Sequence, residues 1–418
     1  QNGSTIMRLL VHWNTTAPTA PASPADPFDP AYRFDDIDEA VRSAQTNDLE
    51  VMITISGTPR WANRGQTPNV APTRMADFQA FARAIASRYS GRNDGIPFVR
   101  FWSVWNEPNL TTFLKPQFNA KGKSVAPATY ARIAAAGFAG IKAGNPLAKV
   151  AVGETSARGR DKRVKGVSDS HSPGKFAELV AKANKRLRFD GWAHHPYPFN
   201  PNSAPSQVVK WPNVSLASLP RFQKGLSQWF KRKSPEVWIT EYGHQTRPQD
   251  RFGVPYSTQA TYIKRAIDIA KRFTFVPMFI WFVYQDSPGQ PWESGLYTTT
   301  GAAKAPSPTR FQSSARGVDA RNAVYSFPAR TASPLVSVAA RKFCMANPAG
   351  TPIEVTWRVQ SGATVVRTGT QTVPLRTDCT LPTRLGFTVA KGGKYTASFS
   401  LSDGDGTQGA RTLTIRGR

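Results

Sequence analysis

The stretch FWSVWNEPNL (residues 101–110) joins a run of apolar side chains to a carboxylic acid. The longer run FVRFWSVW (98–105) has large apolar residues at neighbouring positions, which predicts a strand covered on both faces, as in a parallel sheet flanked by helices. Glu107 follows two residues after this strand, between an asparagine and a proline. Because active sites of parallel α/β sheets lie at strand ends, the rest of the chain decides whether Glu107 has a chemical role.

Strand-like and helix-like segments alternate on both sides of this stretch. The other predicted strands are 6–13, 51–55, 149–153, 189–197, 236–243 and 275–284. Apolar residues at helical spacing predict helices at 34–48, 75–90, 129–144, 174–185, 218–232 and 258–273, with a weaker helix at 306–315. This alternation predicts a (β/α)8 TIM barrel over residues 1–316, with an open doubly wound sheet as the alternative. Seven strands are recognisable, so an eighth is expected before residue 1 or in a segment without a clear pattern.

The C-terminal quarter has a different pattern. Residues 317–334 are expected to form a linker, and residues 335–418 contain short alternating segments separated by turn residues. The strands predicted there are 335–343, 353–359, 363–369, 386–393, 395–406 and 411–417. They indicate a small all-β sandwich. Its single tryptophan, Trp357, is expected in the core of this sandwich, since a glycan-binding surface would show a row of exposed aromatic residues.

Net charge and cysteine content limit the kinds of binding partner and the cellular compartment that can be expected. The chain has 418 residues and a net charge of +27, of which +19 falls before residue 317 and +8 after it. Positive charge spread in this way favours anionic partners, or serves solubility alone. Cys344 and Cys379 predict one disulfide in an oxidising compartment, with two buried thiols as the alternative. The start at Gln1 fits a secreted chain whose leader has been removed. No stretch reaches the ~20 apolar residues of a membrane helix, and nothing fixes the oligomeric state.

A second carboxylic acid occupies the same kind of position as the first. Glu241 ends the strand at 236–243, as Glu107 follows the strand at 98–105. Two carboxyl groups that meet at one end of a barrel can flank a glycosidic bond, one protonating the leaving oxygen and the other attacking the anomeric carbon. The alternative for each residue is a structural role, as a helix cap or an arginine partner.

Three motifs together resemble those of the clan A glycoside hydrolases, in particular the cellulase-like barrels of families 39 and 5. They are WNEP (105–108), HHPYP (194–198) and ITEYG (239–243), and the similarity covers residues 5 to about 316. The resemblance implies hydrolysis with retention, with Glu107 as acid/base and Glu241 as nucleophile. It also makes the first recognisable strand the family's second, so the family's first strand is expected upstream of Gln1.

The same resemblance implies roles for residues around the two carboxylates. Arg8 is expected beside Glu241, where a positive charge favours the ionised carboxylate, and Asn106 is expected to contact the sugar 2-hydroxyl. Tyr197 would donate a hydrogen bond to the nucleophile, and His195 would touch the sugar or the acid/base. Further candidates for sugar contacts are Trp281 as an aromatic platform, for which core packing is the alternative, and more weakly Trp61, Trp292 and Glu293.

A basic segment at 158–172 is the sequence's one indication of the substrate. It carries Arg158, Arg160, Lys162, Arg163 and Lys165. The hypothesis is that it holds an anionic carbohydrate at the barrel end, and the alternative is a solvated loop. No metal or cofactor is expected, since the five histidines show no ligand spacing.

Two other classes of function stay open. A barrel that binds glycan without cleaving it would have the same architecture, although the presence of both carboxylates favours catalysis. A polyanion-binding or nucleic-acid-binding protein would explain the charge. No zinc knuckle, recognition helix or RNA-binding signature occurs in the sequence, so no nucleic-acid partner is expected.

Overall fold

The computed structural model describes most of the barrel and parts of the C-terminal region. The described residues are 3–47, 49–93, 95–248, 250–290, 292–315, 323–326, 335–340, 352–374, 383–384, 390, 393–402 and 407–416. The predicted disulfide partners Cys344 and Cys379 lie outside them, as does nearly all of the strand predicted at 386–393.

Seven parallel strands form the main sheet. They are β1 (Ile6–His12), β2 (Glu50–Ser56), β3 (Phe101–Val104), β4 (Lys149–Ser156), β5 (Gly191–His195), β6 (Glu236–Tyr242) and β7 (Phe279–Trp281). Each strand is bonded to the next in chain order from β1 to β7. A doubly wound sheet reverses its strand order part-way, so this unbroken order excludes that alternative and confirms the TIM-barrel prediction. The curved sheet is nearly closed, and no ladder joins β1 to β7 among the described strands.

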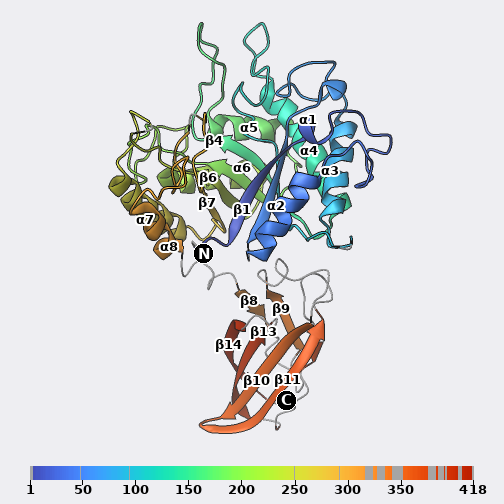
Figure 1. Ribbon diagram of the computed structural model, residues 1–418, viewed down its shortest axis with the longest axis vertical. Coiled ribbons are helices and arrows are strands. Elements are labelled where there is room, and N and C mark those ends of the chain that lie inside the picture. The colour runs from blue at the N-terminus through green and yellow to red at the C-terminus, as the bar shows by residue number, and fades with distance from the viewer. Residues whose placement is uncertain are drawn as a thin grey trace.

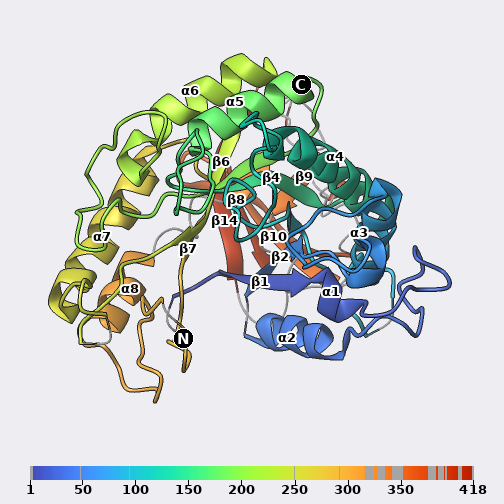
Figure 2. The same cartoon turned by 90° about the horizontal axis from the view of Figure 1, so that it is seen from above.

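Helices cover the outer face of this sheet, as Figures 1 and 2 show. They are the short α1 (Trp13–Thr16), then α2 (Asp35–Thr46), α3 (Met75–Arg88), α4 (Ala126–Gly144), α5 (Pro173–Ala183), α6 (Leu219–Phe230), α7 (Tyr256–Arg272) and α8 (Ser307–Ala315). The predicted helices are therefore confirmed, with ends that differ by a few residues. The last strand is shorter than the predicted 275–284 at both ends, and Pro277, which lacks the N–H that a ladder requires, precedes its start.

The core between sheet and helices is rich in aromatic side chains. Trp13 stacks on Phe81 at 5.5 Å between ring centroids, and Trp102 and Trp192 are fully buried. Burying each such side chain contributes roughly 1.5–3 kcal/mol. This aromatic layer holds the strands in place, and it therefore also fixes the positions of the side chains at the strand ends.

Inside the barrel, apolar and polar layers follow one another along the strands. The lower layer contains Met52, Phe101, Ala151, Ala193, Trp238 and Met278. Alternate residues of a strand point to the same side, so the residues two positions further on point inward as well. On five strands these residues are polar: Arg8, Thr54, Ser103, His195 and Thr240. The strand period therefore builds a polar floor beneath the end of the barrel at which the strands terminate, here called the mouth.

The C-terminal strands form antiparallel sheets of their own. β11 (Thr364–Pro374), β10 (Pro352–Ser361), β13 (Lys394–Ser402) and β14 (Thr407–Arg416) lie in that order in one sheet. β12 (Thr383–Arg384), β9 (Leu335–Ala340) and β8 (Ala323–Ser326) form the other. This confirms the all-β character, and it places β8 within the segment expected to be a linker. Trp357 is 6% exposed, as expected for a core residue, and packs over Gly369.

None of the helices in the described part of the chain has the length and apolar character needed to span a membrane.

Candidate active site

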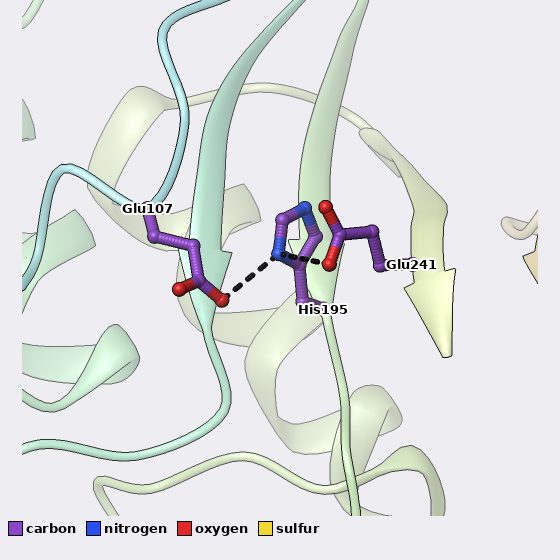
Figure 3. Close-up of side chains that lie close together, drawn as sticks. All are labelled: Glu107, His195 and Glu241. Atoms are coloured by element: carbon purple, nitrogen blue, oxygen red, sulfur yellow. Dashed lines mark hydrogen bonds and ion pairs between the residues drawn. The ribbon is translucent and has the colours of Figure 1, made fainter. Parts of the chain in front are cut away.

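Glu107 and Glu241 meet at the mouth, one after β3 and the other on β6 (Figure 3). One carboxylate oxygen of each residue and a ring nitrogen of His195 lie within 4.8 Å of one another. His195 Nδ1 lies 3.0 Å from Glu107 Oε1 and 3.5 Å from Glu241 Oε2. The side chains of Glu107 and Glu241 are 14% and 12% exposed, so both can be reached from the mouth.

The backbone between β3 and Glu107 bends sharply to bring the carboxylate inward. Trp105 and Glu107 have positive φ angles of 74° and 35°, a region that side chains other than glycine rarely adopt. The Trp105 indole donates a hydrogen bond to the Phe113 carbonyl, and the Glu107 N–H donates one to the Glu154 carbonyl at 2.9 Å. Surrounding contacts thus hold a strained turn, as is common at functional sites.

Arg8 joins the floor to Glu241. Its guanidinium donates to Glu241 Oε1, to Asn106 Oδ1 at 2.8 Å and to Thr54 Oγ1 at 2.8 Å. Burial disfavours the charge on Arg8, but Glu154 and Glu241 outweigh burial and raise its pKa. Arg8 is therefore a fixed cation, and it orients Glu241 from below, as the sequence predicted.

Glu154 is a third carboxylate that the sequence analysis missed. It lies on β4, is fully buried, and its Oε2 accepts hydrogen bonds from His195 Nε2 at 2.6 Å and Thr240 Oγ1 at 2.8 Å. The same oxygen is 3.3 Å from Arg8 Nη2. Its signal was present in KVAVGETS (149–156), where an acid follows an apolar strand just as Glu107 does.

A bulge in β4 turns Glu154 inward. The register between β4 and β5 shifts between Val152 and Thr155, and within this bulge Gly153 and Glu154 have φ angles of 104° and 44°. The Tyr130 hydroxyl accepts the Gly153 N–H at 2.6 Å and donates to the Val104 carbonyl at 2.9 Å. One buried tyrosine therefore fixes the ends of β3 and β4 together.

Gly153→Ala is expected to disturb this bulge more than an ordinary core substitution would. A Cβ at this position would come within 2.5 Å of the Trp192 ring, and the φ of 104° is unfavourable for alanine. We expect a loss of stability of roughly 1–3 kcal/mol and lower activity, measured by denaturant unfolding and by turnover. Gly166→Ala is the control, because it shares a positive φ but has no heavy atom within 4 Å of the added Cβ. Equal losses in both variants would show that the Trp192 contact is unimportant.

The charges around His195 favour its protonated form. Burial lowers its pKa, but Glu241, Glu107 and Glu154 raise it to a net value of about 10. Burial raises the pKa of Glu154, but Arg8 and His195 together lower it to about 2. His195 is therefore an imidazolium at neutral pH, with one N–H directed at Glu154 and the other at Glu107.

The pH dependence of stability should peak near pH 6.5. His195 has its pKa raised from 6.5 to about 10, so its contribution is complete below 6.5 and is lost as the pH rises toward 10. Burial lowers the pKa of His171, His194 and His244 to about 4, 3 and 4, so stability is also lost as the pH falls from 6.5 through those values. Denaturant unfolding followed by tryptophan fluorescence, at pH 4 to 9, measures both limbs. His195→Gln should flatten the alkaline limb, by about 1.4 kcal/mol per pH unit; an unchanged limb would contradict a cationic His195.

The structure brings some of the other predicted residues to the carboxylates. Tyr197 donates to Glu241 Oε2 at 2.8 Å, and burial followed by Glu241 raises the pKa of this tyrosine. Asn106 is 6% exposed, and its Oδ1 is occupied by Arg8. The Trp292 ring lies 4.9 Å from the Tyr197 ring between centroids. Tyr197 and Asn106 thus complete the floor beneath Glu241, and Trp292 adds an aromatic wall.

Two further candidates for sugar contacts, Trp281 and Trp61, have other partners. Trp281 is buried in the core, where its indole donates to the Ser294 carbonyl and its ring packs edge-on against Tyr242. This placement favours the core-packing alternative. A partly exposed ring near Tyr197 belongs instead to the next residue, Phe282. Trp61 donates to the Ala17 carbonyl and packs against Trp13.

Glu293 supports a loop through its backbone. Its carbonyl accepts hydrogen bonds from Thr246 and from the buried Lys304, which also forms an ion pair with the buried Asp286. Burial, with Asp286 next, raises the pKa of the Glu293 carboxyl. This loop carries Trp292 to the mouth, so Glu293 helps to position that side chain.

Glu107, His195 and Glu241 are close enough to be considered as metal ligands. In this structure His195 Nδ1 lies 3.0 Å from Glu107 Oε1 and His195 Nε2 lies 2.6 Å from Glu154 Oε2, so both ring nitrogens already have hydrogen-bond partners.

Comparisons with known proteins agree with this architecture. A model of the family "Cellulase (glycosyl hydrolase family 5)" matches residues 1–286. A family 39 glycoside hydrolase from the gut symbiont Bacteroides cellulosilyticus WH2 is similar in structure, with a TM-score of 0.55 and 17% identity over 90% of this chain and 74% of that one. A glucosidase from Croceicoccus marinus has a TM-score of 0.57 and 13% identity over 89% of this chain and 86% of that one. No curated protein matches.

The family model covers more than half of the chain, and this chain is therefore a glycoside hydrolase. The chain belongs to the cellulase family, glycosyl hydrolase family 5.

Proposed function

We propose that this chain hydrolyses a glycosidic bond with retention of anomeric configuration, with Glu241 as nucleophile and Glu107 as acid/base. The observation that carries the proposal is the short separation of the two residues, with one oxygen of each within 4.8 Å. Retaining enzymes hold their carboxyl groups about 5–5.5 Å apart, whereas inverting enzymes leave about 6.5–9.5 Å for a water molecule.

The surroundings of the two carboxyl groups differ, and this difference supports the proposed roles. Both oxygens of Glu241 are held, Oε1 by Arg8 and Oε2 by Tyr197. This fixes an ionised carboxylate in one orientation, which a nucleophile needs. Among the described residues, the carboxyl of Glu107 is hydrogen-bonded only to His195. Glu107 therefore has one oxygen free to exchange a proton with substrate or water.

The reaction would proceed in two balanced steps. In the first, Glu241 forms a bond to the anomeric carbon as the bond to the leaving oxygen breaks and that oxygen takes the proton of Glu107. In the second, Glu107 accepts a proton from water, whose oxygen displaces Glu241 from the anomeric carbon. With its Oδ1 held by Arg8, Asn106 has its amide N–H groups available for the sugar 2-hydroxyl.

A mechanism-based label tests the proposal. The full chain is incubated with 2-deoxy-2-fluoro glycosyl fluorides of xylose, glucose, galactose, arabinose and uronic acids, and intact mass is read. One adduct on the peptide that contains Glu241, absent from Glu241→Gln, would support the assignment and identify the sugar. An adduct on another residue would refute it. If no adduct forms, turnover of polysaccharides is measured, and glycan binding without turnover would favour the non-catalytic alternative.

We also propose that the chain is secreted and that Cys344 pairs with Cys379. The support is the pair of cysteines in a β-rich region. Peptide mass mapping without reductant, after blocking free thiols, would show a linked pair; two blocked thiols would exclude the disulfide.

A further inference from the structure

The charge at the mouth is divided unevenly between two halves. The loops after β2, β3, β4 and β5 (57–74, 105–125, 157–172 and 196–218) contain twelve Lys or Arg residues and three acidic residues. The loops after β1, β6 and β7 (13–34, 243–255 and 282–306) contain four basic and five acidic residues. A uniformly basic surface would not produce this contrast. Positive charge is therefore concentrated on the half of the mouth that carries Glu107, here called the basic arc.

The three acidic residues of the basic arc are already engaged. Glu107 belongs to the active site, Asp161 accepts hydrogen bonds from the Ser172 N–H and hydroxyl, and Asp169 lies 3.5 Å from Arg163. Lys121, Lys123, Lys162 and Lys165 are exposed. Their charges are thus left for a ligand.

Two loops of the basic arc contact each other directly after Glu107. The segment after Glu107 and the loop after β4 are joined by a bridge between Leu110 and Ser170, and the Thr111 N–H donates to the Asp169 carbonyl at 3.2 Å. Two loops, one teal and one green, rise above the strand ends in Figure 1 and correspond to the segments before α4 and before α5. The two loops that carry these lysines therefore lie at the same end of the barrel as Glu107.

An apolar face for sugar rings lies next to these charges. Phe199, in the loop after β5, is 40% exposed, and the Arg158 guanidinium lies 5.6 Å from its ring centroid. Arg158 also donates to the Phe199 carbonyl, which ties the loops after β4 and β5 together. Aromatic rings suit the C–H faces of sugars, and a guanidinium can bind carboxylate or sulfate with two hydrogen bonds. A neutral glycan would use only the first of these features.

We infer that the substrate is an acidic glycan whose carboxylate or sulfate groups bind the basic arc. This rests on the proposed function, because it names the substrate class of that same site. The contacts are between exposed charges, so they strengthen at low salt and weaken as ionic strength rises.

Binding to the full-length Glu107→Gln variant tests the inference without requiring turnover. The probes are labelled oligogalacturonate, a sulfated galacto-oligosaccharide, a cello-oligosaccharide and a single-stranded DNA of equal charge, each at low and high salt. We expect one of the two acidic sugars to bind at least about tenfold more tightly than the neutral one, which corresponds to about 1.4 kcal/mol. Which of the two binds distinguishes carboxylate from sulfate.

Two sets of substitutions that remove positive charge test whether acidic sugars bind at the basic arc. Replacing Lys121, Lys123, Lys162 and Lys165 by Gln should weaken acidic-sugar binding about tenfold. The matched control replaces Lys182, Lys185, Arg186 and Lys233 by Gln. These four residues are exposed near the opposite end of the barrel, so their replacement should change the affinity for the acidic sugar less than twofold. Circular dichroism checks that both variants fold.

Each outcome has a definite meaning. Equal binding of neutral and acidic sugars, equal effects of the two sets, or DNA binding as tight as that of the acidic sugar would overturn the inference. Failure of the proposed function would appear separately, as the absence of a fluoro-sugar adduct and of turnover in the wild-type chain.

Discussion

Glu241→Gln is expected to lower kcat/KM by roughly 10⁴-fold or more, because it removes the group that forms the bond to the anomeric carbon. The amide is nearly the same size as the carboxylate, so Arg8 and Tyr197 keep a partner at their present positions. The barrel should therefore stay folded while turnover is lost. Steady-state kinetics on an aryl glycoside, with the unfolding midpoint as a check, measures the two effects separately.

Glu107→Gln provides the comparison that distinguishes a nucleophile from an acid/base. Its loss should be about 10²–10⁴-fold on substrates with poor leaving groups. It should be much smaller for the first step with a good leaving group, which needs no proton. Added azide should restore turnover to Glu107→Gln and give a glycosyl azide of unchanged configuration. If the two variants respond alike to leaving group and azide, the assignment of roles is wrong.

Glu154→Gln is expected to cost about 3–5 kcal/mol of stability, because it leaves Arg8 and His195 with less compensation in a buried site. Glu154 is fully buried and holds both cations through one oxygen. Without its charge, burial should lower the pKa of His195 from its present value of about 10. NMR titration of the His195 ring, together with the alkaline limb of the unfolding curve, measures this change directly.

Thr240→Val is the matched control for Glu154. It removes one hydrogen bond to the same oxygen, at 2.8 Å, and leaves the charge in place. We expect a loss of about 1 kcal/mol and an unchanged titration of His195. A Glu154→Gln variant that kept the wild-type His195 titration would show that Glu154 only fills space.

Much of the fold could be predicted because apolar periodicity determines it. Runs such as VMITI at 51–55 are short and rich in β-branched residues, which favours strands, and segments with helical spacing fill the intervals between them. The strand-end rule then made Glu107 and Glu241 candidates, and the resemblance of WNEP, HHPYP and ITEYG to clan A motifs implied their roles. What remained hidden depends on backbone geometry: Glu154 reaches the site through a bulge with positive φ, which the predicted strand at 149–153 did not include.

The orientation of single aromatic rings could not be predicted for a similar reason. Trp281 and Phe282 are neighbours, and their side chains point in different directions from the end of β7. Sequence cannot tell which of two adjacent rings faces the mouth, because a register change of one residue reverses every side chain. The register between β6 and β7 does shift near this point.

The position of His195 between Glu107 and Glu241 has a consequence for the charge of the site during the proposed reaction. The proposed first step begins with a proton on Glu107 and a negative charge on Glu241, with Glu154 and the two cations Arg8 and His195 beside them. In the glycosyl-enzyme, Glu241 is a neutral ester and Glu107 has become the anion, so the total is unchanged. The negative charge has only moved across the mouth, and the same N–H of His195 lies 3.5 Å from where it begins and 3.0 Å from where it arrives. Both halves of the cycle can therefore run in an environment that is electrically constant and requires little rearrangement.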